Sequence, residues 1–209
     1  MKFYDCQSAP SPRRVRIFLA EKGVELASVQ VDLGAGEHLG ETFRSLNPDC
    51  TVPVLELDDG TALTESFAIC QYLESVYPDP PLMGRDDRER ALVTQWNAKV
   101  ESQGLAAVAE AFRNRSRGFT GRALTGPEGF GQIPELVERG RRRAELFLAR
   151  LDAELAEREF VAGDVFTVAD ITALVTVDFA GRIKLPLPEG ADNLHRWHEV
   201  VSARPGAKV

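Results

Sequence analysis

Twenty residues from Asn47 to Ser66, N-P-D-C-T-V-P-V-L-E-L-D-D-G-T-A-L-T-E-S, carry most of the fold information in this chain. Residues 52–57 form an apolar run that predicts a strand, with Pro53 near its head. Proline has no backbone N–H, and a strand tolerates it at a first or edge position. Asp-Asp-Gly at 58–60 predicts a hairpin turn into a second strand over residues 61–63.

The helix expected after this hairpin begins at Ser66 and extends to Val76, because apolar residues recur at helical spacing. A carboxylate and a hydroxyl, Glu65 and Ser66, stand at its start. At a helix N-terminus this pair is typical of simple capping, but it can also hold a ligand that carries both an ammonium and a carboxylate. The stretch therefore predicts a site for an amino-acid-like ligand.

The sequence before this stretch predicts the rest of one α/β unit. Strands are expected over residues 2–5 and 26–32, and a short helix within residues 34–46. Ser11 and Pro12 are typical of the N-cap and first position of a helix that ends at Lys22-Gly23. Strand, helix, strand and hairpin in this order predict a mixed sheet. The proline-rich segment 77–81 ends the unit, which we place at residues 1–80.

No strand pattern follows Asp86, so residues 86–209 are expected to form a second, all-helical domain. Long helices are predicted over 86–117 and 135–159, with a glycine-rich loop between them, and a last helix over 193–203. Thr167 and Asp170 have the spacing of a capping box, ahead of an apolar helix that we expect to be buried.

Composition excludes several classes of function. The net charge is −7, and the first 80 residues hold 13 acidic and 6 basic side chains, which does not favour binding to nucleic acid or to an anionic membrane. The chain has no apolar run of membrane-spanning length and no signal-peptide pattern. Its three cysteines have no metal-binding or disulfide spacing, so we expect no metal site and a cytoplasmic location.

Taken together, the motifs resemble those of the glutathione transferase superfamily, and the resemblance covers nearly the whole chain. It depends on their order, listed here along the sequence: Arg14-Val15-Arg16-Ile17, Glu21-Lys22-Gly23, Gly36-Glu37-His38-Leu39, Asn47-Pro48, Val52-Pro53, Glu65-Ser66, Phe160 to Asp164, and Thr167 to Asp170. The resemblance implies a thioredoxin-like α/β N-terminal domain followed by an all-α domain. The sequence from Tyr4 to Lys22 is similar to that of an atypical bacterial and fungal branch, which lacks the usual active-site Ser, Cys or Tyr.

The resemblance also implies a glutathione site in the first domain. Pro53 is expected to be a cis proline, which lets the Val52 backbone pair with the cysteinyl part of glutathione. Glu65 is expected to bind the γ-glutamyl ammonium. Ser66 is expected to bind the γ-glutamyl carboxylate with its hydroxyl and N–H, and His38 is expected near the glycyl end.

The group that activates the glutathione thiol is not evident, because Ala9 stands where many classes of the family have Ser or Cys. Ser11, together with the N-terminus of the first helix, is our candidate, since that end of a helix favours a thiolate. A serine at this position is more often a helix N-cap, and the two roles do not exclude each other. Alternatives are Ser8, Cys6 and Tyr4, or a water molecule held by polar groups of the second domain, for which the candidates are Asn97, Glu101 and Arg115.

The implied activity is conjugation of glutathione, as co-substrate, to small hydrophobic electrophiles, in a homodimer. Phe112, Phe119 and Phe130 are candidates for the wall of the electrophile pocket, although core packing explains each equally well. Two other functions remain open. One is a non-enzymatic binding or scaffold protein, which Ala9 favours. The other is a glutathione-dependent reductase or isomerase, and the missing Cys at position 9 counts against the reductase.

Overall fold

Residues 1–209 are all described by the computed structural model, and the first 76 of them build a four-stranded sheet and its helices. The strand order is β2-β1-β3-β4. The strands are β1 (Lys2–Asp5), β2 (Ala27–Gln30), β3 (Val54–Glu56) and β4 (Ala62–Leu63). β1 pairs in parallel with β2 and antiparallel with β3, and β3 pairs antiparallel with β4, so the predicted mixed sheet is confirmed.

Apolar side chains point to both faces of this sheet, and helices pack on each face. The helices are α1 (Pro10–Lys22), the 3-10 turn η1 (Glu37–Leu39), α2 (Glu41–Leu46) and α3 (Ser66–Val76). Phe3 and Leu55 point into the main core with α1 and α3. Val54 faces the other way and packs, with Tyr4, against Phe43 of α2. Because neighbouring residues of a strand face opposite sides, one short sheet holds both layers.

The second strand is shorter than predicted and does not alternate. All four residues of β2 are exposed, Val29 included, and Val31 is buried just beyond the strand. β2 is an edge strand, with a neighbour on one side only. The alternation expected for residues 26–32 was therefore wrong for Val29 and right for Val31.

The remaining chain is helical, as predicted. Its elements are α4 (Asp87–Lys99), the π-helical η2 (Val100–Leu105), α5 (Ala106–Arg115), η3 (Arg117–Phe119), α6 (Glu135–Leu155), α7 (Val168–Ala180), η4 (Gly181–Ile183), α8 (Asp192–Ser202) and η5 (Pro205–Lys208). α6 ends four residues before the predicted Glu159. No helix is both long enough and apolar enough to cross a membrane.

The helix predicted over residues 86–117 is continuous, but its middle turn is π-helical, which the sequence pattern did not indicate. Gly104 lies in that turn, where an added Cβ would come within 2.6 Å of the Phe147 ring of α6. A π-helical turn adds one residue to an α-helix and is often found near functional sites. Here it presents Glu101 to α1.

Helix α7 is the buried helix of the second unit, as predicted, and its capping box is present. Asp170 is fully buried and accepts hydrogen bonds from the backbone N–H groups of Val161 (2.8 Å) and Thr167 (2.9 Å). The indole N–H of Trp197 donates a third bond of 2.9 Å. One carboxylate thus joins the start of α7 to α8 and to the preceding loop.

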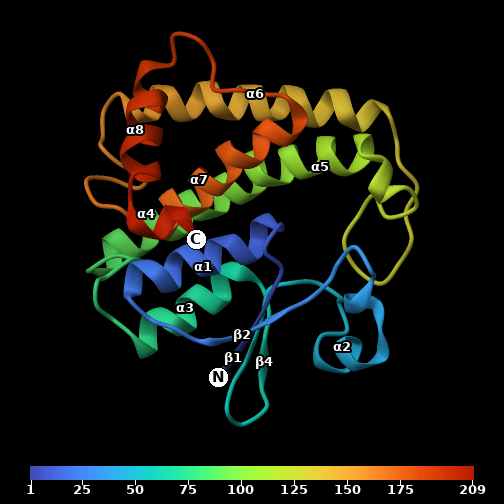
Figure 1. Cartoon of the computed structure of the whole chain (residues 1–209). Coiled ribbons are helices and arrows are strands. Elements are labelled where there is room, and N and C mark those ends of the chain that lie inside the picture. The colour runs from blue at the N-terminus through green and yellow to red at the C-terminus, as the bar shows by residue number, and fades with distance from the viewer.

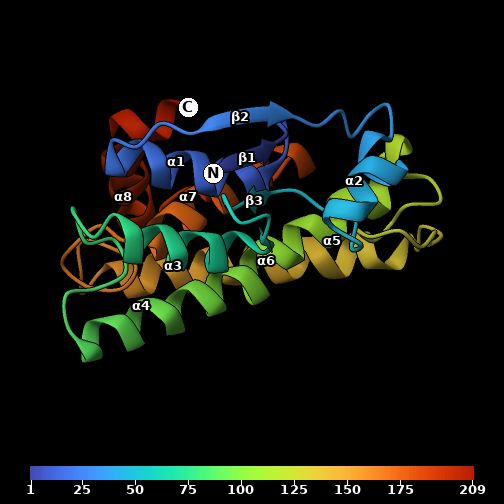
Figure 2. The ribbon, with the colours of Figure 1, turned by 90° about the horizontal axis from the view of Figure 1, so that it is seen from below.

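Helix α1 joins the two units, since it lies between the sheet and the helical layer (Figures 1 and 2). Three of its side chains make ion pairs with the second unit: Arg13 with Asp178 (2.6 Å), Arg14 with Glu101, and Glu21 with Arg204 (2.5 Å). One continuous apolar core runs through both units. The position of α1, whose first turn belongs to the candidate site, is therefore fixed from both sides.

Candidate functional site

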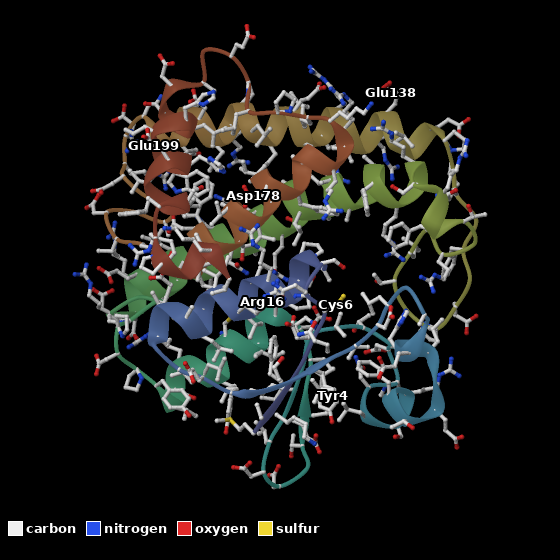
Figure 3. The ribbon with its side chains drawn as sticks, in the orientation of Figure 1. Tyr4, Cys6, Arg16, Glu138, Asp178 and Glu199 are labelled. Carbon is white, nitrogen blue, oxygen red and sulfur yellow. The ribbon has the colours of Figure 1, made fainter.

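The sheet register brings the separate pieces of the predicted site to one end of the sheet. Leu55 of β3 lies opposite Leu63 of β4, so Val52, which precedes β3, lies at the end of the sheet where Ser66 follows β4. In the same way, Tyr4 of β1 lies opposite Val54, so Cys6, which follows β1, lies at the same end of the sheet. Both α1 and α3 begin at this end, and Cys6 lies near the start of α1 (Figure 3).

The backbone of Val52 is free to pair with a ligand. The Val52-Pro53 peptide bond is cis, as the family resemblance implied. Neither the N–H nor the C=O of Val52 has a hydrogen-bond partner within the protein. Because these groups continue the line of β3, an extended peptide can add to them as a further strand does.

Glu65 has an unusual backbone conformation for a residue with a side chain. Its φ of 64° lies in a region that costs an L-residue about 1–3 kcal/mol and is often found at functional sites. The carboxylate is exposed and makes no ion pair or hydrogen bond within the protein. The Glu65 carboxylate is thus free to accept hydrogen bonds from the ammonium of a ligand.

Ser66 begins α3 and is buried, with only 2% of its surface exposed. Its hydroxyl donates a hydrogen bond of 2.9 Å to the backbone carbonyl of Ser11. No side chain caps α3, and the N–H groups of residues 66–68 have no acceptor. These N–H groups and the helix dipole can bind a carboxylate, whereas the Ser66 hydroxyl is already used.

Helix α1 begins two residues earlier than the sequence signal indicated, which corrects the interpretation of Ser11. Ala9 is the N-cap and Pro10 the first helical residue, so Ser11 lies inside the first turn and caps nothing. Pro10 and Pro12 carry no N–H. The Ser11 N–H is therefore the one donor among the first three helical positions, and the Ser11 hydroxyl beside it has no protein partner.

The other candidate activators near this helix start have partners. The Tyr4 hydroxyl donates to Glu56 (2.8 Å), and Cys6 contacts Ser8 (3.6 Å between Sγ and Oγ). In the second unit, polar contacts engage all three candidates: Asn97 accepts from Thr172, Glu101 pairs with Arg14, and Arg115 donates to the Ile183 carbonyl. Of the side chains that we considered at the start of α1, Ser11 alone has its hydroxyl unpaired.

His38 lies in η1, on the side of the first unit that faces the segment after α5 (Figure 1). Its Nδ1 atom is buried without a hydrogen-bond partner. Burial, together with the charges of Arg122 and Arg113, lowers the pKa of His38 below its ordinary value of 6.5. The two arginines were missed from the sequence. A signal was present, because residues 111–127 contain four arginines and no acidic residue.

Phe112 and Phe119, predicted to line the electrophile pocket, lie together. Their rings meet edge to face with centroids 5.4 Å apart, and Phe112 also contacts Phe179 of α7 at 5.1 Å. The guanidinium of Arg113 stacks on the Phe119 ring at 4.4 Å. Phe130 is 46% exposed and stands apart from this cluster. The aromatic cluster is formed by residues from α5, η3 and α7.

Two cavities lie outside this region. One, of about 270 Å³, is lined by residues 84–93 and 162–167 of the second unit. The other, of about 240 Å³, lies between η2 and α6. None of the predicted site residues lines either of them. We therefore build the functional argument on the helix starts and not on these cavities.

Comparison with known proteins agrees with the geometry. A family described as "Glutathione S-transferase, N-terminal domain" matches residues 9–76, and one described as "Glutathione S-transferase, C-terminal domain" matches residues 105–205. The chain is 38% identical to glutathione S-transferase 2 of Saccharomyces cerevisiae over 212 residues, which cover 100% of this chain and 88% of the relative.

Two further matches cover different shares of the chain. A crystal structure of a glutathione S-transferase domain-containing protein from Marinobacter aquaeolei superposes with a TM-score of 0.91 at 43% identity, covering 99% of both chains. The chain is also similar to maleylacetoacetate isomerase of Pseudomonas aeruginosa, with 43% identity over 93 residues, or 44% of each chain.

Proposed function

The chain belongs to the glutathione S-transferase family, and we propose that it transfers glutathione to small apolar electrophiles. The observation that supports this proposal most is the set of unpaired groups at one end of the sheet. They are the Val52 backbone, the Glu65 carboxylate, the N–H groups that begin α3, and the Ser11 hydroxyl. Together they match the groups of a γ-glutamyl tripeptide with a thiol.

Glutathione lies along Val52 in this proposal. Its cysteinyl N–H and C=O pair with the backbone C=O and N–H of Val52, which have no partner within the protein. The γ-glutamyl ammonium binds Glu65. The γ-glutamyl carboxylate binds the N–H groups of Ser66 and its successors, where the α3 dipole favours a negative charge. The glycyl end then reaches the side of His38.

The thiol of the bound tripeptide comes to the start of α1, next to Ser11. A free thiol has a pKa of about 8.5, so thiolate is scarce near neutral pH unless the protein stabilises it. The Ser11 hydroxyl and N–H are donors that can do so, since neither has a protein partner. This arrangement supplies a thiolate site without Ser, Cys or Tyr at the position of Ala9.

The chemical step is attack of the glutathione thiolate on an electrophilic carbon. A carbon–sulfur bond forms, and the leaving group departs with the electron pair of the bond that breaks. The proton of the thiol has already gone to solvent. We propose that the apolar part of the electrophile contacts Phe112 and Phe119, which belong to the aromatic cluster of the second unit.

We further propose that the protein acts as a homodimer and that its biological substrate is an apolar electrophile still to be identified. Sedimentation analysis of the purified chain tests the first part. A particle with twice the chain mass of 23.0 kDa supports a dimer, and a single chain mass contradicts it.

Two alternatives give different results in one experiment. A scaffold protein would bind glutathione, measured by calorimetry, without turning over a chlorodinitrobenzene-type electrophile. An isomerase would bind glutathione and isomerise its substrate without consuming glutathione. We include this alternative because the Pseudomonas relative is named as an isomerase. Binding with consumption of both substrates supports the transferase. Absence of glutathione binding contradicts the transferase and the isomerase, and leaves a scaffold protein that has lost the pocket.

A further inference from the structure

The segment between α5 and α6, residues 116–134, forms a loop that lies beside η1 and α2 in both views (Figures 1 and 2). We call it the α5–α6 loop. It carries Arg122, and Arg113 lies at the end of α5. Neither arginine forms an ion pair, although the first 80 residues, which they face, are strongly acidic. Two guanidinium groups are thus left without a counter-ion.

The α5–α6 loop is held in one conformation by its own polar contacts. The Arg113 guanidinium donates to the backbone carbonyls of Arg122 (2.6 Å), Ala123 (3.1 Å) and Leu124 (2.6 Å). The Gln132 amide donates to the carbonyl of Arg113 at 2.6 Å, and Ala123 is buried. Arg122 is consequently presented from a fixed backbone, which lowers the entropic cost of binding.

Arg122 reaches the first unit but makes little use of its donors there. Its Nη2 atom lies 3.5 Å from the Leu33 carbonyl, at the limit of a hydrogen bond, and its other donors have no protein acceptor. The nearby carboxylates are occupied within their own loop: Asp32 accepts from the Ala35 N–H, and Glu37 accepts from the Asp32 N–H. No acidic side chain of η1 or its flanks neutralises Arg122.

His38 lies in the same place and cannot supply the missing interaction by charge. Its Nδ1 atom is buried and unpaired, and the lowered pKa keeps the ring neutral at pH 7. A neutral imidazole donates one hydrogen bond, whereas a guanidinium presents a planar pair of donors that matches a carboxylate. Arg122 therefore places a cationic group beside His38 and Leu33, and Leu33 packs on the same small apolar cluster as Val52.

We propose that Arg122 binds the glycyl carboxylate of glutathione beside His38, so that the α5–α6 loop of the second unit closes the peptide site of the first. This assignment rests on the function proposed above. Arg122 then raises the affinity for the tripeptide glutathione relative to the dipeptide γ-glutamylcysteine, because γ-glutamylcysteine has no glycine. The γ-glutamyl end remains with Glu65 and Ser66.

The test is calorimetric titration of the full chain with glutathione and with γ-glutamylcysteine. Arg122→Gln is expected to weaken glutathione binding about 10- to 100-fold, the range for a hydrogen bond to a charged group, and to change γ-glutamylcysteine binding less than twofold. Arg117→Gln is the matched control. It removes the same charge from the same loop, but Arg117 is exposed and its guanidinium makes no hydrogen bond.

Three results overturn the assignment: unchanged glutathione affinity in Arg122→Gln, an equal loss for both ligands, or the same loss in Arg117→Gln. Thermal melting of each variant detects a folding defect, and Arg122→Lys gives a second measure, since it keeps the charge and should keep part of the affinity. Failure of the proposed function looks different. There, Glu65→Ala retains wild-type affinity, or the wild-type chain binds neither ligand.

Discussion

The hydroxyl of Ser66 donates a hydrogen bond of 2.9 Å to the backbone carbonyl of Ser11, and this contact joins the first turn of α3 to the first turn of α1. Both helices point their N-termini at the same end of the sheet. The part of the site proposed to bind the γ-glutamyl group and the part proposed to face the thiol are therefore fixed relative to each other. Ser66 thus makes a structural contact in addition to the ligand-binding role that we propose for it.

Replacing Ser66 by Ala should separate these two roles. Loss of the hydroxyl–carbonyl bond is expected to lower the free energy of unfolding by about 1 kcal/mol, measured by urea denaturation. Glutathione affinity should fall only a few-fold, because the N–H groups that begin α3 remain. Ser75→Ala is the control, since the Ser75 hydroxyl bonds within the same helix on the exposed face. An unchanged stability in Ser66→Ala contradicts the structural role.

Glu65 offers a comparison of two variants at a strained position. Glu65→Ala and Glu65→Gly should both weaken glutathione binding about 10- to 100-fold, because each removes the carboxylate that binds the ammonium. Glycine tolerates a φ of 64°, and alanine does not, so the Gly variant should be the more stable by about 1–2 kcal/mol. Calorimetry and urea denaturation measure the two effects. Wild-type affinity in both variants rules out this carboxylate as a ligand group.

Ser11→Ala tests the start of α1 as the site of thiol activation. Turnover of the electrophile at pH 7 should fall about 10- to 100-fold, since one hydrogen bond to a charged sulfur is lost, while the Ser11 N–H remains. Glutathione affinity should change little. Ser8→Ala is the control, because Ser8 is exposed and only contacts Cys6. If the rate of Ser11→Ala equals that of the wild type, the hydroxyl takes no part.

Asp178 of α7 pairs with Arg13 of α1, and we expect acid to weaken this contact between the two units (Figure 3). Burial alone would raise the pKa of Asp178, but hydrogen bonds from His198 and Arg13 and the charge of Arg13 outweigh it, so the pKa lies below its ordinary value. A carboxylate with a depressed folded pKa adds stability above its unfolded pKa of about 3.9, and this is lost as the pH falls through the folded pKa.

Asp178→Asn should accordingly lower the free energy of unfolding at pH 7 by about 1–2 kcal/mol, and the difference from wild type should shrink below pH 4. Urea denaturation at pH 7, 5 and 3.5 measures it. Glu138→Gln is the matched control, because Glu138 is exposed on α6 and makes no ion pair. A difference that stays constant over this pH range excludes the linkage.

Local patterns predicted the secondary structure around Glu65 and Ser66 well. The hairpin and the first helical turn around Glu65 and Ser66 depend on neighbours in sequence, and the start of α3 at Ser66 is confirmed. The start of α1 was predicted two residues too late, because Pro12 suits a first helical position as well as Pro10 does. A turn in which the Ala9 N–H bonds the Cys6 carbonyl sets the helix to begin at Pro10.

Features made by distant contacts could not be predicted. The π-helical turn depends on the approach of Phe147 to Gly104, which are 43 positions apart in the sequence. The position of Arg122 depends on hydrogen bonds that fold a glycine-rich loop back onto Arg113. The four arginines in residues 111–127 do not indicate by their positions in the sequence which of them reaches the first unit.

The pKa of the thiol in bound glutathione tests the central claim most directly, since the start of α1 is proposed to stabilise the thiolate. Ultraviolet titration of thiolate absorbance in the complex should give a pKa clearly below the value of about 8.5 for a free thiol, and Ser11→Ala should move it back toward that value. If glutathione binds but its thiol titrates as in free solution, the protein does not activate the thiol, and the account of this chain as a transferase is contradicted.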